Sequence, residues 1–280
     1  MDKLIAVTGS TGAIGGATAR ILAASGLALR LPVRDLGRAP ALPGATAAEC
    51  SYADRSAAVT ALEGVHTLFM VSASESKDRV EQHLTFVDAA SEAGVQHIVY
   101  TSFFGAAPDA TFTLGRDHWA TEEHIRRSGI AYTFLRNNLY LDVLQHFADD
   151  DGVIRGPAGN GRLAAVARAD VVQVAAVVLR DAAAHAGNTY ELTGPTALTL
   201  AEAAAIISQE TGREVTYRAE SVGEAYGSRQ HFGAPDWQLD AWVSTYTAIA
   251  EGGLARTTTT VQDLTGQPAL DLAQVLHGDR

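Results

Sequence analysis

Three glycines near the start of the chain have the spacing of a nucleotide phosphate-binding turn. Residues Leu4 to Gly16 read LIAVTGSTGAIGG, so an apolar strand runs directly into Gly9, Gly12 and Gly15 where a helix opens. Glycines let the backbone turn sharply and approach phosphate oxygens closely, while the helix amides and the positive end of its dipole face the anion. The turn therefore predicts a site for a dinucleotide pyrophosphate. The alternative is a glycine-rich turn that binds no ligand.

The end of the second predicted strand carries a residue type that selects between two dinucleotides. An acid at this position accepts hydrogen bonds from the ribose 2′-hydroxyl of NAD, whereas an arginine suits the 2′-phosphate of NADP. The sequence reads Pro32-Val33-Arg34-Asp35. Because Arg34 comes first after the strand and a guanidinium pairs bidentately with phosphate, the sequence favours NADPH over NADH. Asp35 counts against this choice, and the alternative is that both residues are solvated loop charges.

Strand-length apolar runs alternate with helix-length segments up to Leu135, which predicts a parallel sheet with crossover helices. We expect an α/β fold, a Rossmann-like doubly wound sheet whose ligand crevice lies beyond the carboxyl ends of the strands. Glycines at 26, 64, 94 and 129 stand as helix stops, and Asp54 is a natural N-cap. The predicted strands are Leu4–Thr8, Ala28–Val33, Ala45–Cys50, Thr67–Val71, His97–Thr101 and Ala131–Leu135, and the predicted helices are Ala13–Ala24, Arg55–Leu62, Arg79–Ala93 and His118–Arg127.

After residue 150 the pattern becomes mixed. We therefore predict a dinucleotide-binding domain over 1–150 and a smaller α/β substrate domain over 151–280, with residues 170–194 returning to the first sheet. The expected elements are short strands and turns over Gly152–Arg168, an apolar helix over Asp170–Ala184, a strand over Asn188–Leu192, a helix over Thr199–Thr211 and a strand over Val215–Tyr217.

Composition limits the classes of function. With 280 residues, 47% of them hydrophobic, the chain can bury a large core. A net charge of −11 and only two lysines oppose direct binding to nucleic acid. No apolar run approaches the roughly 18 residues that span a bilayer, and the first strand begins too near Met1 for a signal peptide, so we expect a cytoplasmic protein that does not bind membranes. The single cysteine, Cys50, is interpreted as a small buried hydrophobe rather than a nucleophile, because no basic group adjoins it in sequence.

Four segments make the chain resemble the NmrA-like branch of the atypical short-chain dehydrogenases. They are Thr-Gly-Ser-Thr-Gly at 8–12, Val-Arg-Asp at 33–35, Tyr-Thr-Ser at 100–102 and Ala-Tyr-Thr-Phe-Leu-Arg-Asn-Asn-Leu-Tyr at 131–140. Within this family the chain is most similar to the type 2 NADPH:quinone oxidoreductases and the triphenylmethane dye reductases. The resemblance covers nearly the whole chain.

The resemblance implies NADPH as the cofactor, with contacts from several loops. Thr101 stands where dehydrogenase hydroxyls commonly face the nicotinamide, or it satisfies the end of its strand. At Ser51 relatives commonly carry an acid, and this departure predicts a weaker adenine contact. The implied contacts are Gly9, Ser10, Thr11, Gly12, Ala13 and Ile14 to the phosphates, Arg34 with Arg38 as a further candidate to the 2′-phosphate, and Ser72, Ala73, Ser74, Asn138 and Tyr140 on the nicotinamide side.

The Tyr-x-x-x-Lys pair that short-chain dehydrogenases usually employ is absent. The only lysines are Lys3 and Lys77, and the residue four before Lys77 is Ala73. The lysine of that pair lowers the tyrosine pKa for proton transfer at a carbonyl oxygen, so its absence counts against epimerases, dehydratases and alcohol dehydrogenases. A quinone or triarylmethyl cation accepts hydride without a protein acid, so positioning alone suffices and we assign no catalytic residue. We also expect no metal site, because none of the nine histidines forms His-Glu-x-x-His.

Two functions from different classes remain. The first is an NADPH-dependent reductase that passes hydride to a quinone, dye or similar aromatic electrophile. The second, which the resemblance also suggests, is a non-enzymatic NADP(H)-binding redox sensor that acts through a protein partner. We favour the enzyme because the aromatic residues after Val222 are suited to a closed acceptor pocket, although ordinary core is the slightly better interpretation of each one taken singly. His118 hydrogen-bonds an acceptor oxygen or is a surface histidine, and the sequence leaves a homodimer open. The candidates for the acceptor site are Phe103, His118, Tyr140, Phe232 and Trp237.

Overall fold

The computed structural model describes residues 3–278, which form two compact units. The first unit runs to Ser102 and also takes in residues 117–136 and 171–190, and the second contains residues 103–116, 137–170 and the chain from Glu191 onward. Each unit has its own hydrophobic core. The predicted division into a cofactor domain and a substrate domain at residue 150 stays a prediction. No helix in the described part of the chain is both long enough and apolar enough to cross a membrane.

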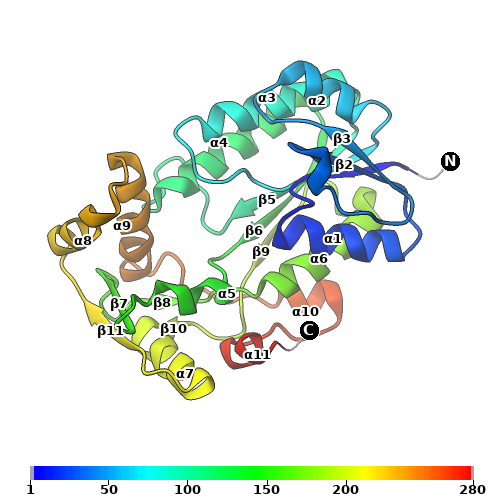
Figure 1. Ribbon diagram of the computed structural model, residues 1–280. Helices are drawn as coiled ribbons and strands as arrows, with labels where there is room; N and C mark the ends of the chain where they lie inside the picture. The colour runs from blue at the N-terminus through cyan, green and yellow to red at the C-terminus, as the bar shows by residue number, and fades with distance from the viewer. Residues whose placement is uncertain (1–2, 279–280) are drawn as a thin grey trace. The chain divides into compact units, whose positions relative to one another are not determined.

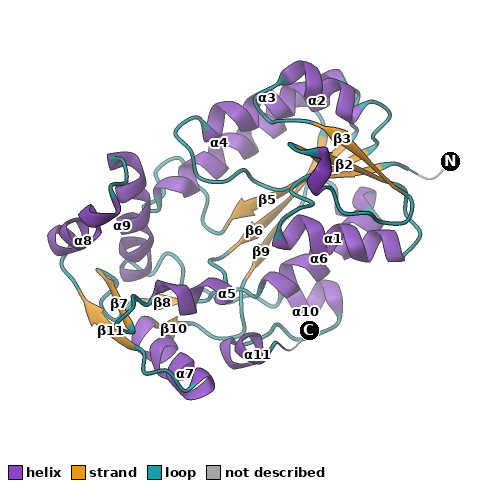
Figure 2. Ribbon diagram, in the orientation of Figure 1, coloured by secondary structure: helices purple, strands orange, loops and turns teal. Residues whose placement is uncertain are grey.

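The first unit is built on a seven-stranded sheet with the order β3-β2-β1-β4-β5-β6-β9 (Figure 2). The chain steps outward from β1 to β3 and then crosses to β4 on the other side of β1, which makes β1 the point where the strand order reverses. The pairings between β3 and β2, β2 and β1, β1 and β4, and β4 and β5 are all parallel. The predicted Rossmann-like α/β fold is confirmed. The strands are β1 (Ile5–Val7), β2 (Leu29–Val33), β3 (Ala45–Glu49), β4 (Thr67–Met70), β5 (His97–Phe103), β6 (Ala131–Asn137) and β9 (Thr189–Leu192).

Helices cover both faces of this sheet, with α2, α3 and α4 on one face and α1 and α6 on the other (Figure 1). Every residue of β1, β4 and β5 is buried, as expected for strands covered on both sides. The Asp54 carboxylate caps α2 as predicted, accepting a hydrogen bond from the Ala57 amide at 3.0 Å. The helices are α1 (Ala13–Ala24), α2 (Arg55–Leu62), α3 (Arg79–Glu92), α4 (Thr113–Ser128) and α6 (Arg168–Arg180), with 3-10 turns η1 (Leu36–Arg38) and η3 (Ala182–His185).

The start of α4 differs from the prediction. The sequence predicts this helix from His118 onward. The structure begins the helix at Thr113. The added turn carries Leu114, which packs against the core of the second unit, so tertiary packing outweighs the low helix propensity of Gly115.

The second unit combines two small sheets with short helices. Strand β7 (Val153–Gly156) pairs in parallel with β11 (Thr216–Ala219), and β8 (Arg162–Leu163) pairs antiparallel with β10 (Leu198–Thr199). The short strands expected after Gly152 are therefore present. The helices are α5 (Leu141–Leu144), α7 (Leu200–Thr211), α8 (Val222–Arg229), α9 (Asp236–Ala250), α10 (Thr260–Thr265) and α11 (Leu272–His277), with 3-10 turns η2 (Gln145–Phe147) and η4 (Gln230–Phe232).

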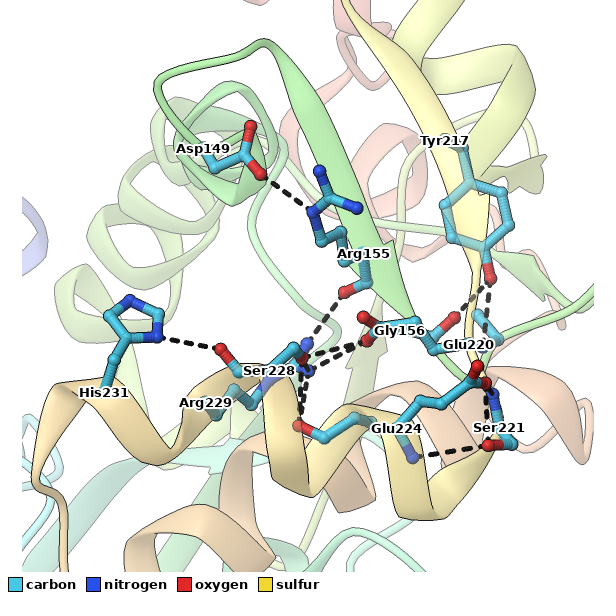
Figure 3. A network of polar contacts seen from close by, with 12 residues as sticks. Asp149, Arg155, Gly156, Tyr217, Glu220, Ser221, Glu224, Ser228, Arg229 and His231 are labelled. Atoms are coloured by element: carbon cyan, nitrogen blue, oxygen red, sulfur yellow. Dashed lines mark hydrogen bonds and ion pairs between the residues drawn. The ribbon is translucent and has the colours of Figure 1, made fainter.

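A buried arginine of α8 binds the backbone of the neighbouring strand β7 (Figure 3). The guanidinium of Arg229 donates a hydrogen bond to the Arg155 carbonyl at 2.7 Å and forms an ion pair with the Glu220 carboxylate at 3.3 Å. The same guanidinium lies 5.0 Å from the ring centre of Tyr246, in cation–π contact. A side chain at Gly156 would meet that ring at 2.3 Å, so the backbone of β7 passes directly against Tyr246.

Arg229→Leu should destabilise the protein strongly. The substitution leaves the Glu220 carboxylate buried without a cation, which costs about 3–5 kcal/mol of unfolding free energy. Urea denaturation measures the change. The matched control is Arg162→Leu, which breaks an exposed pair with Glu202 that solvent already screens, so its loss should be much smaller. Equal losses in the two variants would contradict a stabilising role for the buried pair.

Candidate functional site

A pocket of about 430 Å³ lies in the first unit beyond the carboxyl ends of β1, β2, β3 and β4. This is the place where doubly wound sheets bind ligands. The structure thus brings together the predicted glycine turn, Arg34 and the predicted Ser72–Ser74 segment. The lining residues are Thr8, Gly9, Ser10 and Thr11 after β1, Pro32, Val33 and Arg34 at the end of β2, Cys50, Ser51, Tyr52 and Ala53 after β3, Val71, Ser72, Ala73, Ser74, Glu75 and Ser76 after β4, and Gln82 from α3.

The three glycines of the turn have different reasons to be glycine. Gly9 has a φ of +61°, a left-handed conformation that favours glycine. A Cβ at Gly15 would lie 2.4 Å from the Thr8 carbonyl oxygen and 2.5 Å from that of Gly9, so the fold itself excludes a side chain there. At Gly12, by contrast, φ is −103° and the nearest protein atom to a Cβ is 3.4 Å away. No described residue requires glycine at position 12, which fits a position kept open for a closely approaching ligand.

The beginning of α1 offers hydrogen-bond donors that the described residues leave unused. Gly12 occupies the N-cap position, no side chain caps the helix, and no acid lies in its first turn. The Ser10 hydroxyl is buried and has no hydrogen-bond partner among residues 3–278. An uncapped helix start with a positive dipole end and a spare hydroxyl fits a pyrophosphate.

Arg34 lies at the pocket wall immediately after β2, with its side chain exposed. The acid that counted against NADPH has a local structural role, because the Asp35 carboxylate caps η1 by accepting a hydrogen bond from the Gly37 amide at 2.9 Å. Arg38 ends η1 and is not among the residues that line the pocket. The geometry therefore favours Arg34 over Arg38 as the contact to a 2′-phosphate.

Tyr52 is a pocket residue whose role the sequence reasoning missed. Its hydroxyl lies 2.6 Å from the Thr8 hydroxyl oxygen and donates to the Val71 carbonyl at 2.7 Å, while its ring stacks on Phe86 with centroids 4.1 Å apart. Burial raises the pKa of Tyr52, so the phenol stays protonated. Burial together with the nearby Asp54 also raises the pKa of the Cys50 thiol to about 12. The phenol and the thiol at the pocket wall are thus structural groups.

His118 is not the surface histidine that the sequence allowed. His118 belongs to α4 and its side chain is buried. Its Nδ1 lies 2.9 Å from the Tyr100 hydroxyl, and its Nε2 lies 3.0 Å from Nη2 of Arg79. Burial and the Arg79 charge hold the pKa of His118 well below its usual range, so the imidazole is neutral. Thr101 likewise has a structural partner, because its hydroxyl oxygen accepts the Ser72 amide hydrogen bond at 2.8 Å.

The remaining candidates belong to the second unit, and their predicted contacts with cofactor or acceptor stay predictions. Asn138 is buried, and its side-chain amide donates to the Leu254 carbonyl at 3.0 Å. Tyr140 accepts a hydrogen bond from the Asn137 side-chain amide at 3.2 Å. Phe103 is buried, with its ring centre 4.6 Å from that of Phe112. Two further candidates, Phe232 and Trp237, lie near the surface: Phe232 is 62% exposed and Trp237 is half-buried.

Comparison with known proteins shows which family has this sequence and fold. The model of the NmrA-like family matches residues 1–228. This chain belongs to the NmrA-like family. Quinone oxidoreductase 2 of Escherichia coli is 35% identical over 278 residues, covering 97% of this chain and 96% of that protein. Its crystal structure with NADPH matches with a TM-score of 0.89 at 34% identity, over 98% of this chain and 99% of that one.

Two further similar proteins are named as reductases of other compounds. The NAD(P)H azoreductase of Xenophilus azovorans is 31% identical over 276 residues, covering 97% of this chain and 96% of that protein. The crystal structure of Citrobacter sp. triphenylmethane reductase with NADP(H) matches with a TM-score of 0.84 at 31% identity, over 98% of this chain and 99% of that one. The predicted family resemblance is confirmed.

The glycine turn yields a paired prediction. Gly12→Ala should keep the unfolding free energy within about 1 kcal/mol of the wild-type value, because its Cβ has room, while weakening NADPH binding by about tenfold or more. Gly15→Ala should instead lower the unfolding free energy by about 1–3 kcal/mol, because its Cβ overlaps two carbonyl oxygens. Thermal denaturation and fluorescence titration with NADPH separate the two. Unaltered NADPH affinity in Gly12→Ala would contradict a phosphate contact at this turn.

Cofactor selectivity gives a second prediction for this pocket. Arg34→Ala should weaken NADPH binding by about tenfold or more while changing NADH binding little, because only NADPH carries the 2′-phosphate. Arg38→Ala removes the same charge from a residue outside the pocket lining and should change neither affinity appreciably. Titration of both variants with both cofactors tests this. Equal losses for NADPH and NADH in Arg34→Ala would show that Arg34 does not contact the 2′-phosphate.

Proposed function

We propose that this protein is an NADPH-dependent reductase that transfers hydride to a quinone, a dye or a related aromatic electrophile. The observation that carries the proposal is the pocket that joins an uncapped glycine turn to Arg34. Family members at 35% and 31% identity over nearly the whole chain are named quinone oxidoreductase and azoreductase, which supports the same class of reaction.

Three groups of pocket residues, at the ends of three neighbouring strands, match three parts of NADPH. The amides and hydroxyl of the turn Gly9–Ile14 would hold the pyrophosphate, and the Arg34 guanidinium would hold the 2′-phosphate. The segment Ser72–Ser74 would lie on the nicotinamide side of the turn, since β4 flanks β1 on the side opposite β2. When bound, the cofactor supplies a hydride from its nicotinamide ring.

The chemistry of the pocket favours acceptors that need no proton from the protein. The sequence has no Tyr-x-x-x-Lys pair, and burial raises the pKa of the pocket tyrosine, Tyr52, rather than lowering it. A ketone needs a proton at its oxygen, whereas a quinone or a cationic dye takes hydride directly. The protein then contributes by holding donor and acceptor at about 3–3.5 Å, which replaces a bimolecular encounter by an intramolecular step.

The test is NADPH oxidation against a panel of benzoquinones, naphthoquinones, azo dyes and cationic triarylmethane dyes, followed by the loss of NADPH absorbance. We expect turnover with at least one acceptor, faster with NADPH than with NADH, and loss of that preference in Arg34→Ala. A simple ketone serves as the control acceptor and should not be reduced. Tight NADPH binding without turnover on any acceptor would contradict the reductase and favour an NADP(H)-binding sensor that acts through a protein partner.

A further inference from the structure

The backbone that follows β4 in the pocket wall is held by side chains from neighbouring elements. The Val71 amide donates to the Thr8 hydroxyl oxygen at 2.9 Å, and the Tyr52 hydroxyl donates to the Val71 carbonyl at 2.7 Å. The next amide, that of Ser72, donates to the Thr101 hydroxyl oxygen at 2.8 Å. Side-chain partners thus replace strand pairing at the point where this segment leaves the sheet.

Ala73 is held from both sides by two residues of α3. Its amide donates to Nε2 of His83 at 2.9 Å, and its carbonyl accepts from Nε of Arg79 at 2.9 Å. Arg79 and His83 are four residues apart and therefore lie on the same face of the helix. The two residues are only 4% and 0% exposed, and neither belongs to the pocket lining. They fix the peptide groups on either side of Ala73 from behind the pocket wall.

The hydrogen bonds around His83 determine which of its two ring nitrogens carries the proton. Because Nε2 accepts the Ala73 amide hydrogen, that nitrogen carries no proton. Its Nδ1 lies 3.0 Å from the Thr121 hydroxyl oxygen, whose own proton goes to the Asp117 carbonyl at 2.8 Å, so Nδ1–H donates to Thr121. Burial and the Arg79 charge lower the pKa of His83 to about 3, which keeps this arrangement in place at neutral pH.

Arg79 is fixed by the remaining nitrogens of its guanidinium. Nη1 pairs with the Asp117 carboxylate at 3.2 Å, and Nη2 donates to Nε2 of His118 at 3.0 Å. The His118 ring is anchored in turn by the Tyr100 hydroxyl at 2.9 Å. A buried guanidinium with this set of partners has one orientation, so its grip on the Ala73 carbonyl is rigid.

We propose that Arg79 and His83 are positioning residues for the nicotinamide half of the cofactor, an inference that rests on the proposed function. In this strand order the adenosine half extends toward the end of β2, where Arg34 lies, and the other half extends toward the end of β4. A segment that is already ordered in the free protein loses less conformational entropy when the cofactor binds. The clamp on Ala73 therefore favours binding of the nicotinamide half specifically.

The experiment compares two ligands on matched variants of the full chain. NADPH contains both halves of the cofactor, whereas 2′,5′-ADP contains only the adenosine half with its 2′-phosphate. His83→Phe keeps a ring of similar size but removes the acceptor for the Ala73 amide. His83→Gln restores an acceptor oxygen at the same reach. His97→Phe is the control, because His97 is another buried histidine of the first unit, bonded at 2.9 Å to Thr133 rather than to the pocket wall.

His83→Phe should raise the Kd for NADPH by about tenfold and leave the Kd for 2′,5′-ADP within about twofold. His83→Gln should restore most of the NADPH affinity, and His97→Phe should leave both affinities near the wild-type values. If His83→Phe does not fold, Arg79→Lys keeps a cation beside Asp117, removes the Nε donor to the Ala73 carbonyl and should give the same pattern. Unaltered NADPH affinity, equal losses for both ligands, or an equal effect of His97→Phe would overturn the proposal.

The wild-type titration separates this inference from the function on which it rests. Wild-type protein that binds neither NADPH nor 2′,5′-ADP would contradict the proposed cofactor site. Wild-type protein that binds both, together with variants that bind both equally well, would contradict only the positioning role.

Discussion

The first unit depends on how closely the first turn of α1 approaches the end of β1. Gly15 lies so near the carbonyls of Thr8 and Gly9 that even a methyl group would overlap them. This contact places the free amides at the start of the helix directly above the strand edge, where a phosphate can reach them. Thr8 also connects this strand end to the neighbouring loops, because its hydroxyl oxygen accepts a hydrogen bond from the Val71 amide and is hydrogen-bonded to the Tyr52 hydroxyl. The end of β1 thus sets the position of both the glycine turn and the pocket wall next to it.

Behind that wall, burial decides the charge of the polar groups. The imidazole of His83 stays neutral because a cation in that position would be desolvated and would face Arg79. The carboxylate of Glu122 is also buried, but two arginines pair with it: Arg136 at 2.6 Å and Arg126 at 3.1 Å. Neutral or fully paired groups make a stiff support and a poor source of protons. These neutral and paired groups therefore agree with a reaction in which the protein positions the reactants and donates no proton.

The parts of the molecule that the sequence predicted are those with local signals. Helices α1 and α2 begin and end where predicted, because the glycine turn, the Asp54 cap and the glycine stops are encoded within a few residues. The clamp on Ala73 was not predicted, because a histidine ten residues away along the chain bonds a backbone amide, and no pattern marks such a pair. Asp35 was misleading for a related reason: an acid that caps a short turn and an acid that binds a ribose look alike in sequence. Packing against the second unit's core, through Leu114, likewise moved the start of α4.

The first unit is assembled from three separate stretches of chain, and this has a consequence for its synthesis. Strand β9 flanks β6 at one edge of the sheet, yet it is translated only after the long excursion of residues 137–170 into the second unit. Until then β6 is an unpaired edge with open backbone hydrogen-bond groups, the kind of surface that invites pairing with another chain. A nascent chain halted near residue 150 is therefore an incomplete sheet rather than a finished domain. Because residues 171–190 follow that excursion, the first unit cannot be cut out of the chain by a single break.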